Sequence, residues 1–114
     1  MANGEPKADI LQGTLDLIIL QSLSTLGPMH GYAIARRIEQ MAETLVRLSQ
    51  GSIYPALIRL QQQHLISTKW GTSETNRRVK FYALTKAGVS QLETEVESWE
   101  KSTALVGRFL GGRS

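Results

Sequence analysis

The feature that most constrains the fold is the run GSIYPALIRL over Gly51–Leu60. Polar and aromatic residues come first, and the leucines, Leu57 and Leu60, follow at helical spacing. A helix of this kind exposes its polar N-terminal end while the later apolar face packs inward. A segment rich in Lys and Arg follows at residues 77–80. The two segments together predict a helix with an exposed start and a basic hairpin beside it.

Length and composition place the chain among ordinary globular proteins. Its 114 residues suffice for one domain with its own core, and 41% of them are hydrophobic. No apolar run is long enough to span a bilayer, and the polar start, with Glu5 and Asp9, does not resemble a signal peptide. The absence of cysteine excludes disulfides and cysteine-based metal sites and fits a reducing cytosol. We therefore expect a cytoplasmic protein without cofactor, metal or membrane partner.

Positive charge is concentrated in the middle of the chain. Residues 30–86 carry nine Lys or Arg and three Glu, whereas residues 1–29 carry one Lys and three acidic residues. Residues 87–114 carry three basic and four acidic residues. Such a basic centre is typical of a protein that binds a polyanion, although a solvated basic surface would have the same composition.

The first half of the chain reads as helices. Apolar spacing predicts a helix over 10–26, which Gly27-Pro28 ends, because glycine caps a helix and proline cannot continue it. A second helix is expected from Gly31. Residues 43–48 connect it to the third helix, and we expect two leucines of this connection, Leu45 and Leu48, to pack beneath it.

The third helix begins near Ser49 or Ser52, either of which can act as its N-cap. Pro55 favours the start at Ser52, because proline is tolerated in a first helical turn and destabilising further in. The next two segments, Ile66–Trp70 and Val79–Leu84, are rich in β-branched and aromatic residues and predict a hairpin.

The predicted hairpin loop, Gly71–Arg78, is longer and more polar than a tight turn requires, as functional or mobile loops are. Thr85 is then placed to cap the last helix. That helix has the most regular periodicity of the chain, with spacings of three and four residues typical of a heptad seam. The seam consists of Val89, Leu92, Val96, Trp99, Thr103, Val106 and Leu110. We expect it to pair with a second copy of the chain, the alternative being packing on its own domain.

The expected fold class is mainly α with a small β-hairpin, a winged helix-turn-helix plus a C-terminal dimerisation helix. Residues 1–9 are expected to be a flexible N-terminus and residues 10–85 the DNA-binding domain. Residues 86–110 form the dimerisation helix, and residues 111–114 a frayed tail.

The motifs resemble the PadR transcriptional regulators, named for the phenolic acid decarboxylase repressor. The resemblance covers roughly residues 10–92 and is most specific in the Gly51–Leu60 run. The other matching residues are Gly13-x-Leu15 with Leu17 and Ile18, Gly27-Pro28-x-His30-Gly31-Tyr32-x-Ile34, Leu65-Ile66, Trp70, Arg77-Arg78-x-Lys80-x-Tyr82-x-Leu84-Thr85 and Gly88. With one helix after the wing, the chain looks like the short PadR-like subfamily. The resemblance implies a regulator of transcription.

Double-stranded DNA is therefore the expected partner, bound by the third helix and the wing. The residues expected at this interface are Ser49, Gln50, Ser52, Tyr54, Pro55 and Arg59 in the helix and Arg77, Arg78 and Lys80 in the wing. The helix start offers hydroxyls, an amide and unpaired backbone N–H groups for phosphates and base edges. We expect Arg59 to contact a phosphate or Glu39, and the wing cations to follow the DNA backbone or enter the minor groove. Tyr32 is expected to pack in the core, unlike Tyr54.

Enzymatic motifs are missing from the sequence. The two histidines, His30 and His64, have no acidic partner nearby in sequence, and neither a phosphate-binding loop nor a zinc-protease motif occurs. We expect no enzyme, and we interpret His30 as a structural residue at the start of the second helix. A protein-interaction module pairing through the heptad helix is the alternative function, against which the basic centre argues.

We expect a homodimeric repressor that binds a roughly palindromic operator and is associated with the nucleoid of a bacterial-type cell when bound. Because some short PadR-like proteins stack planar drugs on an aromatic residue of this last helix, Trp99, with Leu15 and Ile19, is a candidate site for a planar hydrophobic effector. Alternatively, Trp99 fills the dimer core.

Overall fold

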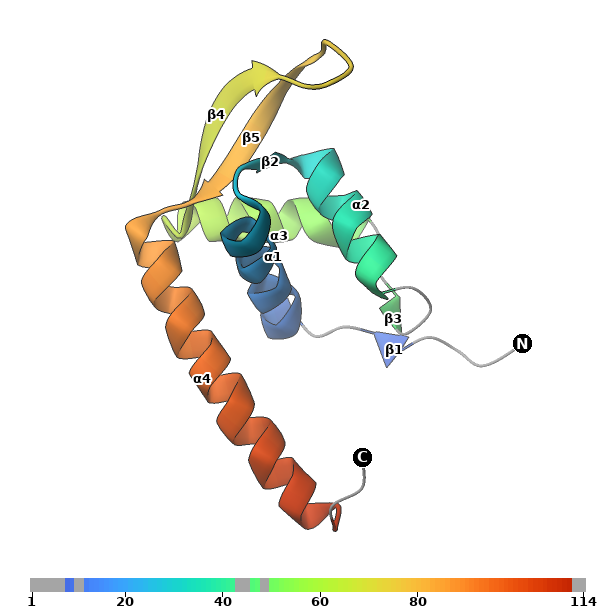
Figure 1. The fold of residues 1–114 in the computed structure, drawn as a ribbon, viewed down its shortest axis with the longest axis vertical. Coiled ribbons are helices and arrows are strands. Elements are labelled where there is room, and N and C mark those ends of the chain that lie inside the picture. The colour runs from blue at the N-terminus through green and yellow to red at the C-terminus, as the bar shows by residue number, and fades with distance from the viewer. Residues whose placement is uncertain (1–7, 10–11, 43–45, 48–49, 112–114) are drawn as a thin grey trace, which may run out of the picture.

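The computed structural model describes residues 8–9, 12–42, 46–47 and 50–111 (Figure 1). Its longer elements follow the expected order of three helices, a hairpin and a last helix, so the predicted fold class is confirmed. They are α1 (Gln12–Leu26), α2 (Gly31–Ala42), α3 (Gln50–Gln62), β4 (Ile66–Thr72), β5 (Arg78–Leu84) and α4 (Lys86–Phe109). Three two-residue strands accompany them: β1 (Ala8–Asp9), β2 (Met29–His30) and β3 (Val46–Arg47).

The junction between α1 and α2 is fixed by local chemistry. Gly27 has a φ of +80°, and its N–H donates to the carbonyl of Leu23 at 3.0 Å, which confirms the predicted glycine cap. The second helix starts at Gly31, as predicted. The Nδ1 atom of His30 accepts a hydrogen bond from the Ala33 N–H at 3.3 Å, so His30 caps α2. The structural role expected for His30 is thereby confirmed.

The start of α3 differs from the prediction. The helix begins at Gln50, so Pro55 is its sixth residue and the predicted start at Ser52 is wrong. Proline there removes one backbone donor within the helix. The candidate cap Ser49, and the packing expected of Leu45 and Leu48, lie outside the described residues.

The N-terminal region contains one element that the sequence did not indicate. Strand β1, at residues 8–9, lies within the segment expected to be flexible and pairs in parallel with β3. A two-residue strand has too few positions to show alternation of apolar and polar residues. Residues 1–7 lie outside the described residues.

One apolar core holds α1, α2 and α3 together. Its centre has residues that are at most 1% exposed: Ile19 and Leu20 from α1, Ile34 and Ala35 from α2, and Ile53, Ala56, Leu57 and Leu60 from α3. Fully burying an aliphatic side chain stabilises a fold by roughly 1.5–3 kcal/mol. Because four residues on one side of α3 are committed to this core, its opposite side must face outward.

The hairpin belongs to a three-stranded antiparallel sheet of order β2-β5-β4. Its base lies on the helices and its far end projects beyond them, as Figure 1 shows. The predicted long loop is wrong, because Gly71, Thr72 and Arg78 lie in the strands. A shorter loop, residues 73–77, closes the hairpin instead. In it, Ser73 N–H donates to Arg77 C=O at 2.8 Å, and Asn76 has a φ of 64°, which asparagine tolerates.

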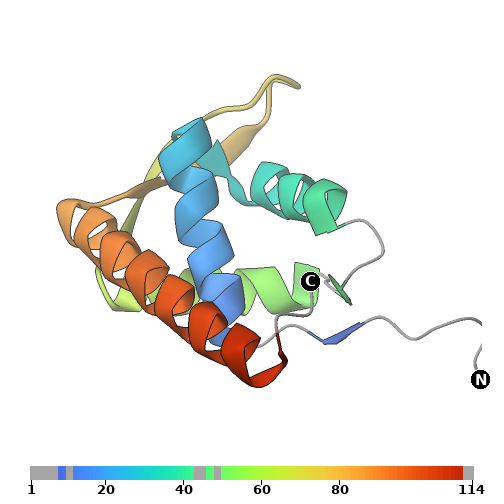
Figure 2. The same ribbon diagram turned by 60° about the horizontal axis from the view of Figure 1, so that its bottom comes forward.

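Helix α4 starts on the domain and leaves it. The hydroxyl of Thr85 accepts from the Gly88 N–H at 3.0 Å, which confirms the predicted N-cap. Figure 2 shows the helix lying across α1, which it contacts. Leu92 is buried in the core, so the predicted pairing with a second chain is wrong for this position, and Val96 packs partly against the same core. Within the described residues, no helix is both long enough and apolar enough to cross a membrane.

Candidate nucleic-acid interface

The outer side of α3 forms the first part of the candidate interface. Its exposed residues lie on one side of the helix: Ser52, Tyr54, Pro55, Ile58, Gln61 and Gln62. They alternate with the buried residues named above, as expected for an amphipathic helix. Gln50 lies at the first position of the helix, where the backbone N–H groups have no partners within the helix. Polar groups that can reach base edges and phosphates are therefore distributed along one exposed side.

Tyr54 lies close to the start of α2 and is partly exposed. A Cβ atom added to Gly31 would lie 2.7 Å from the Tyr54 ring, so a larger residue at the start of α2 would require this ring to move. The side chain nevertheless remains 38% exposed. Burial, and secondarily the nearby Tyr54, raise the pKa of Tyr82 above 10.0. The core packing predicted for Tyr32 is wrong, since that residue is 53% exposed on α2.

Ile58 was not among the residues singled out from the sequence. It is 56% exposed in the middle of the outer side of α3, one turn after Tyr54. The signal was present in the spacing, because position 58 is four residues from Tyr54 and four from Gln62. Its apolar character made it resemble a core residue. An exposed aliphatic side chain in this position is suited to contact a thymine methyl group.

Arg59 has a different partner from the one predicted. Its Nη2 atom donates to the Asp16 carboxylate of α1 at 2.6 Å, so the predicted pairing with Glu39 is wrong. The Arg59 side chain is 28% exposed and that of Asp16 is 21% exposed. The Nε atom of Arg59 is buried without a hydrogen-bond partner among the described residues. The guanidinium therefore ties α3 to α1.

The wing supplies the second part of the interface. All three predicted cations, Arg77, Arg78 and Lys80, are exposed. The guanidinium carbon of Arg78 lies 5.1 Å from the centroid of the Trp70 ring, and the Lys80 ammonium lies 5.8 Å from it. Trp70 itself is about half exposed. The wing thus presents an aromatic ring with two cations close to it.

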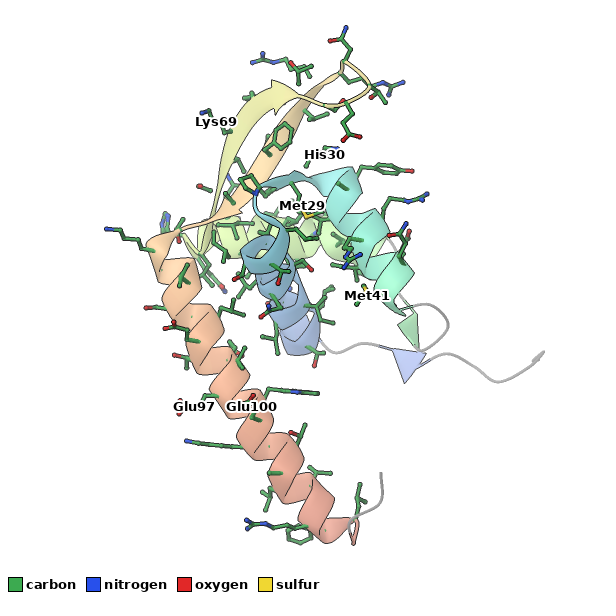
Figure 3. All side chains as sticks on the ribbon, in the orientation of Figure 1. Met29, His30, Met41, Lys69, Glu97 and Glu100 are labelled. Carbon is green, nitrogen blue, oxygen red and sulfur yellow. The ribbon has the colours of Figure 1, made fainter. Side chains whose placement is uncertain are left out.

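The other side of the wing contacts the segment before α2. Lys69, labelled in Figure 3, alternates on β4 with Trp70 and pairs with Phe81 of β5. The rings of His30 and Phe81 meet edge to face at a centroid distance of 5.8 Å. A Cβ atom on Gly71 would lie 2.8 Å from the Phe81 ring, so the ring occupies the space above that glycine. These contacts join the hairpin to the start of α2.

Both histidines make structural contacts at helix ends. His30 caps α2, while His64, two residues after the end of α3, has a φ of 62°, and its carbonyl accepts from the Thr85 hydroxyl at 2.7 Å. Across the described ranges, no cluster of His, Asp or Glu residues is suited to hold a metal ion.

The distal part of α4 carries exposed apolar side chains. From the predicted seam these are Trp99, Val106 and the C-cap residue Leu110, and two more that were not predicted are Leu105 and Phe109. Val89 is also exposed, but it lies at the start of α4. Phe109 is 83% exposed. The hydroxyl of Thr103 donates to the carbonyls of Trp99 and Glu100 at 3.0 and 3.1 Å, so this polar seam residue is satisfied within its own helix.

The predicted effector residues do not form one site in this chain. Leu15 and Ile19 are 4% and 0% exposed and belong to the core, so the expectation that they line a cavity with Trp99 is wrong. A shallow open hollow lies instead between α1 and α4, lined by Gln21, Leu92, Glu93, Val96, Glu97 and Glu100. Figure 3 labels two of its acidic residues, Glu97 and Glu100, on α4.

Comparison with known proteins identifies the family. Residues 19–94 match the model of the transcriptional regulator PadR-like family, and this match covers most of the described fold. The chain belongs to the PadR-like family. A PadR-like transcriptional regulator from Bacillus cereus has the same fold, with a TM-score of 0.78, 32% identity, and coverage of 90% of this chain and 97% of that one. A transcriptional regulator from Clostridium thermocellum gives a TM-score of 0.75 at 28% identity, with coverage of 86% and 91%.

Curated relatives of this PadR-like chain are longer proteins. The transcriptional regulator YqjI of Escherichia coli is 38% identical over 88 residues, which is 77% of this chain and 40% of the relative. An uncharacterised 37.1 kDa protein of a Streptomyces fradiae transposon is 37% identical over 90 residues, 79% of this chain and 24% of the relative. The chain therefore spans less than half the length of either relative.

Proposed function

We propose that this PadR-like protein is a homodimeric, sequence-specific DNA-binding repressor. The observation that carries the proposal is the pair of exposed surfaces on one domain: the outer side of α3 and the cationic wing. Because the core fixes α3 and the wing base independently of any ligand, both surfaces are held in place before DNA binds.

The two surfaces suit different tasks. The outer side of α3 offers Tyr54, Ile58 and glutamines to base edges in the major groove. The wing offers Arg77, Arg78 and Lys80 to phosphates or the minor groove. We propose that α3 gives sequence preference, while the wing gives affinity and position. Asp16 already pairs with the Arg59 guanidinium, so we propose no base contact for Arg59 and allow it only a contact with a phosphate.

The distal part of α4 supports the homodimer. Exposed large apolar residues over 99–110 extend beyond the domain, where the chain's own core cannot cover them. A second copy supplies an equal surface by two-fold symmetry. Two recognition helices would then contact half-sites about 34–36 Å apart, in a roughly palindromic operator.

DNA binding is tested by mobility shift with the DNA upstream of the protein's own gene, against a shuffled fragment of equal length and composition. We expect a shift at lower protein concentration with the upstream DNA, and blocked transcription from a promoter in that fragment. Equal affinity for the two fragments would contradict sequence specificity. Absence of any salt-dependent binding would contradict the proposed function.

The dimer is tested by sedimentation at micromolar concentration with Val106→Glu, which puts a charge on the exposed seam. Thr94→Glu is the matched control, since it adds the same charge at an exposed position of α4 off the seam. We expect a dimer for the wild type and Thr94→Glu, and dissociation for Val106→Glu. A monomeric wild type, or a dimer unaffected by Val106→Glu, would contradict the proposal. Val96 is unsuited to this test because it packs on its own domain.

We further propose that a planar hydrophobic effector binds between the C-terminal helices of the dimer and lowers operator affinity. Trp99 is half exposed on the seam, and stacking on its ring would contribute roughly 0.5–1.5 kcal/mol beyond area burial. Such a compound releases DNA only if it binds the DNA-incompetent arrangement more tightly.

Fluorescence tests this effector site. In Trp70→Phe, Trp99 is the only tryptophan left of the two. We expect its emission to be quenched by planar aromatic or cationic dyes that also release the operator. Emission unchanged across such a panel would show that Trp99 has only a packing role.

A further inference from the structure

We propose that Trp70 is a positioning residue for DNA binding: its ring holds Arg78 and Lys80 together as one two-charge contact for the phosphate backbone. This inference rests on the proposed DNA-binding function. It adds a residue whose part is to arrange the wing cations rather than to contact DNA itself.

The sheet register places the three side chains on one side of the wing. Trp70 of β4 is directly opposite Lys80 of β5, and Thr72 is opposite Arg78. Side chains two positions apart on a strand point to the same side of the sheet, so Arg78 and Lys80 share one side. Trp70 is on that side too, diagonally across from Arg78. Both cationic groups approach the same ring, with distances of 5.1 and 5.8 Å to its centroid. These distances are within the range of cation–π attraction.

Two like charges that approach the same ring repel each other, so holding them there requires an attraction that offsets the repulsion. Within the part of the chain that the structure describes, no carboxylate forms an ion pair with Arg78 or Lys80. The negative face of the tryptophan ring is therefore the group that attracts them both. An aromatic ring offsets the repulsion without cancelling either charge, so both remain available to a phosphate.

Pre-organisation explains why a half-exposed tryptophan is useful here. Arg and Lys have long, flexible side chains, and fixing them on DNA lowers their conformational entropy. When the ring already restricts them, binding lowers that entropy less. We expect removal of the ring to weaken DNA binding roughly tenfold, although all the positive charge remains.

A double-mutant cycle tests the proposal. Operator affinity is measured for the wild type, Trp70→Ala, Arg78→Ala/Lys80→Ala and the triple variant at fixed salt, with thermal melting to verify folding. A positioning role predicts about a tenfold loss for Trp70→Ala in the wild-type background and no further loss in the variant that lacks the two cations. Trp70→Phe, which keeps an aromatic face, should retain most of the affinity.

Direct stacking of Trp70 on DNA would instead give the same loss in both backgrounds, and this outcome overturns the proposal. Unchanged affinity of Trp70→Ala also overturns it, while leaving the DNA-binding function intact. If the wild type itself does not bind DNA, the proposed function fails.

The free protein offers an independent readout. Side-chain protons of Arg78 and Lys80 above the ring should show upfield NMR shifts that disappear in Trp70→Ala. Their absence in the wild type overturns the contact whatever the DNA assay gives.

Discussion

Removing the Asp16 carboxylate should destabilise the fold substantially, because it leaves the Arg59 guanidinium enclosed between α1 and α3 without its partner. The contact is charge-assisted and short, at 2.6 Å, and both side chains are about three-quarters buried. Hydrogen bonds to charged groups contribute about 1.5–3 kcal/mol, and breaking a fully buried pair costs about 3–5 kcal/mol. Residual exposure lets water solvate the freed charge, so we expect about 1.5–3 kcal/mol for Asp16→Ala.

The control is Glu39→Ala, because Glu39 is the partner that the sequence suggested. It is exposed on α2, and its removal should change the free energy of unfolding by less than about 0.5 kcal/mol. Urea unfolding followed by circular dichroism measures both variants, at equal protein concentration because a dimer's stability depends on it. For a chain of this size, the destabilisation of Asp16→Ala corresponds to a melting temperature lower by roughly 6–12 °C.

A double-mutant cycle with Arg59→Ala completes the test. The losses of stability from Asp16→Ala and Arg59→Ala should be strongly non-additive, since each change breaks the same ion pair. The reasoning is refuted if Asp16→Ala is no more destabilising than Glu39→Ala, or if the two losses simply add.

Three further predictions concern packing, pH and base recognition. Gly88→Ala should lower the free energy of unfolding by about 1–3 kcal/mol in urea unfolding, because the new Cβ atom would overlap the Leu65 carbonyl oxygen. Gly107 has open space around it, so the control Gly107→Ala should leave that free energy unchanged or raise it by up to about 1 kcal/mol. The pKa of Tyr82 is raised in the fold, so the stability that this tyrosine contributes is full below pH 10 and is lost as the pH rises through the raised pKa. The wild type should therefore lose stability above pH 10 more steeply than Tyr82→Phe. Equal slopes for the two proteins would contradict this prediction. Replacing an operator thymine that Ile58 contacts by deoxyuridine should weaken wild-type binding about fourfold and leave Ile58→Ala unaffected, while equal effects on both proteins would exclude the methyl contact.

Features governed by local chemistry were predictable from the sequence. Gly27 and Thr85 mark helix ends because their roles depend on φ and on a hydroxyl within reach of nearby backbone groups. Strand β2 was missed for the opposite reason. Its two residues, Met29 and His30, pair with residues more than fifty positions away, and the pairing exists only after the chain has folded.

The sequence indicated which side chains would make contacts, but not which residues they would contact. The heptad spacing of α4 indicates an apolar stripe, but not that Leu92 would meet its own core while Val106 would stay exposed. Arg59 had several acidic residues to choose from, and the packing of α3 on α1 selected Asp16, 43 positions away in sequence. Exposure of Ile58 likewise depends on which side of α3 the core takes.

The central claim is that α3 reads sequence while the wing binds the backbone, and salt-dependent affinity tests it most directly. Fluorescence anisotropy would give Kd over a range of salt for an operator and a shuffled duplex, with the wild type, Tyr54→Ala and Arg77→Ala/Arg78→Ala. We predict that Tyr54→Ala loses preference for the operator at an unchanged salt slope. The wing variant should bind both duplexes more weakly and to the same extent, with a slope of log K against log salt shallower by about one unit for each phosphate that it no longer neutralises. A wing variant with wild-type affinity and slope, or a Tyr54→Ala variant with full operator preference, would contradict the account.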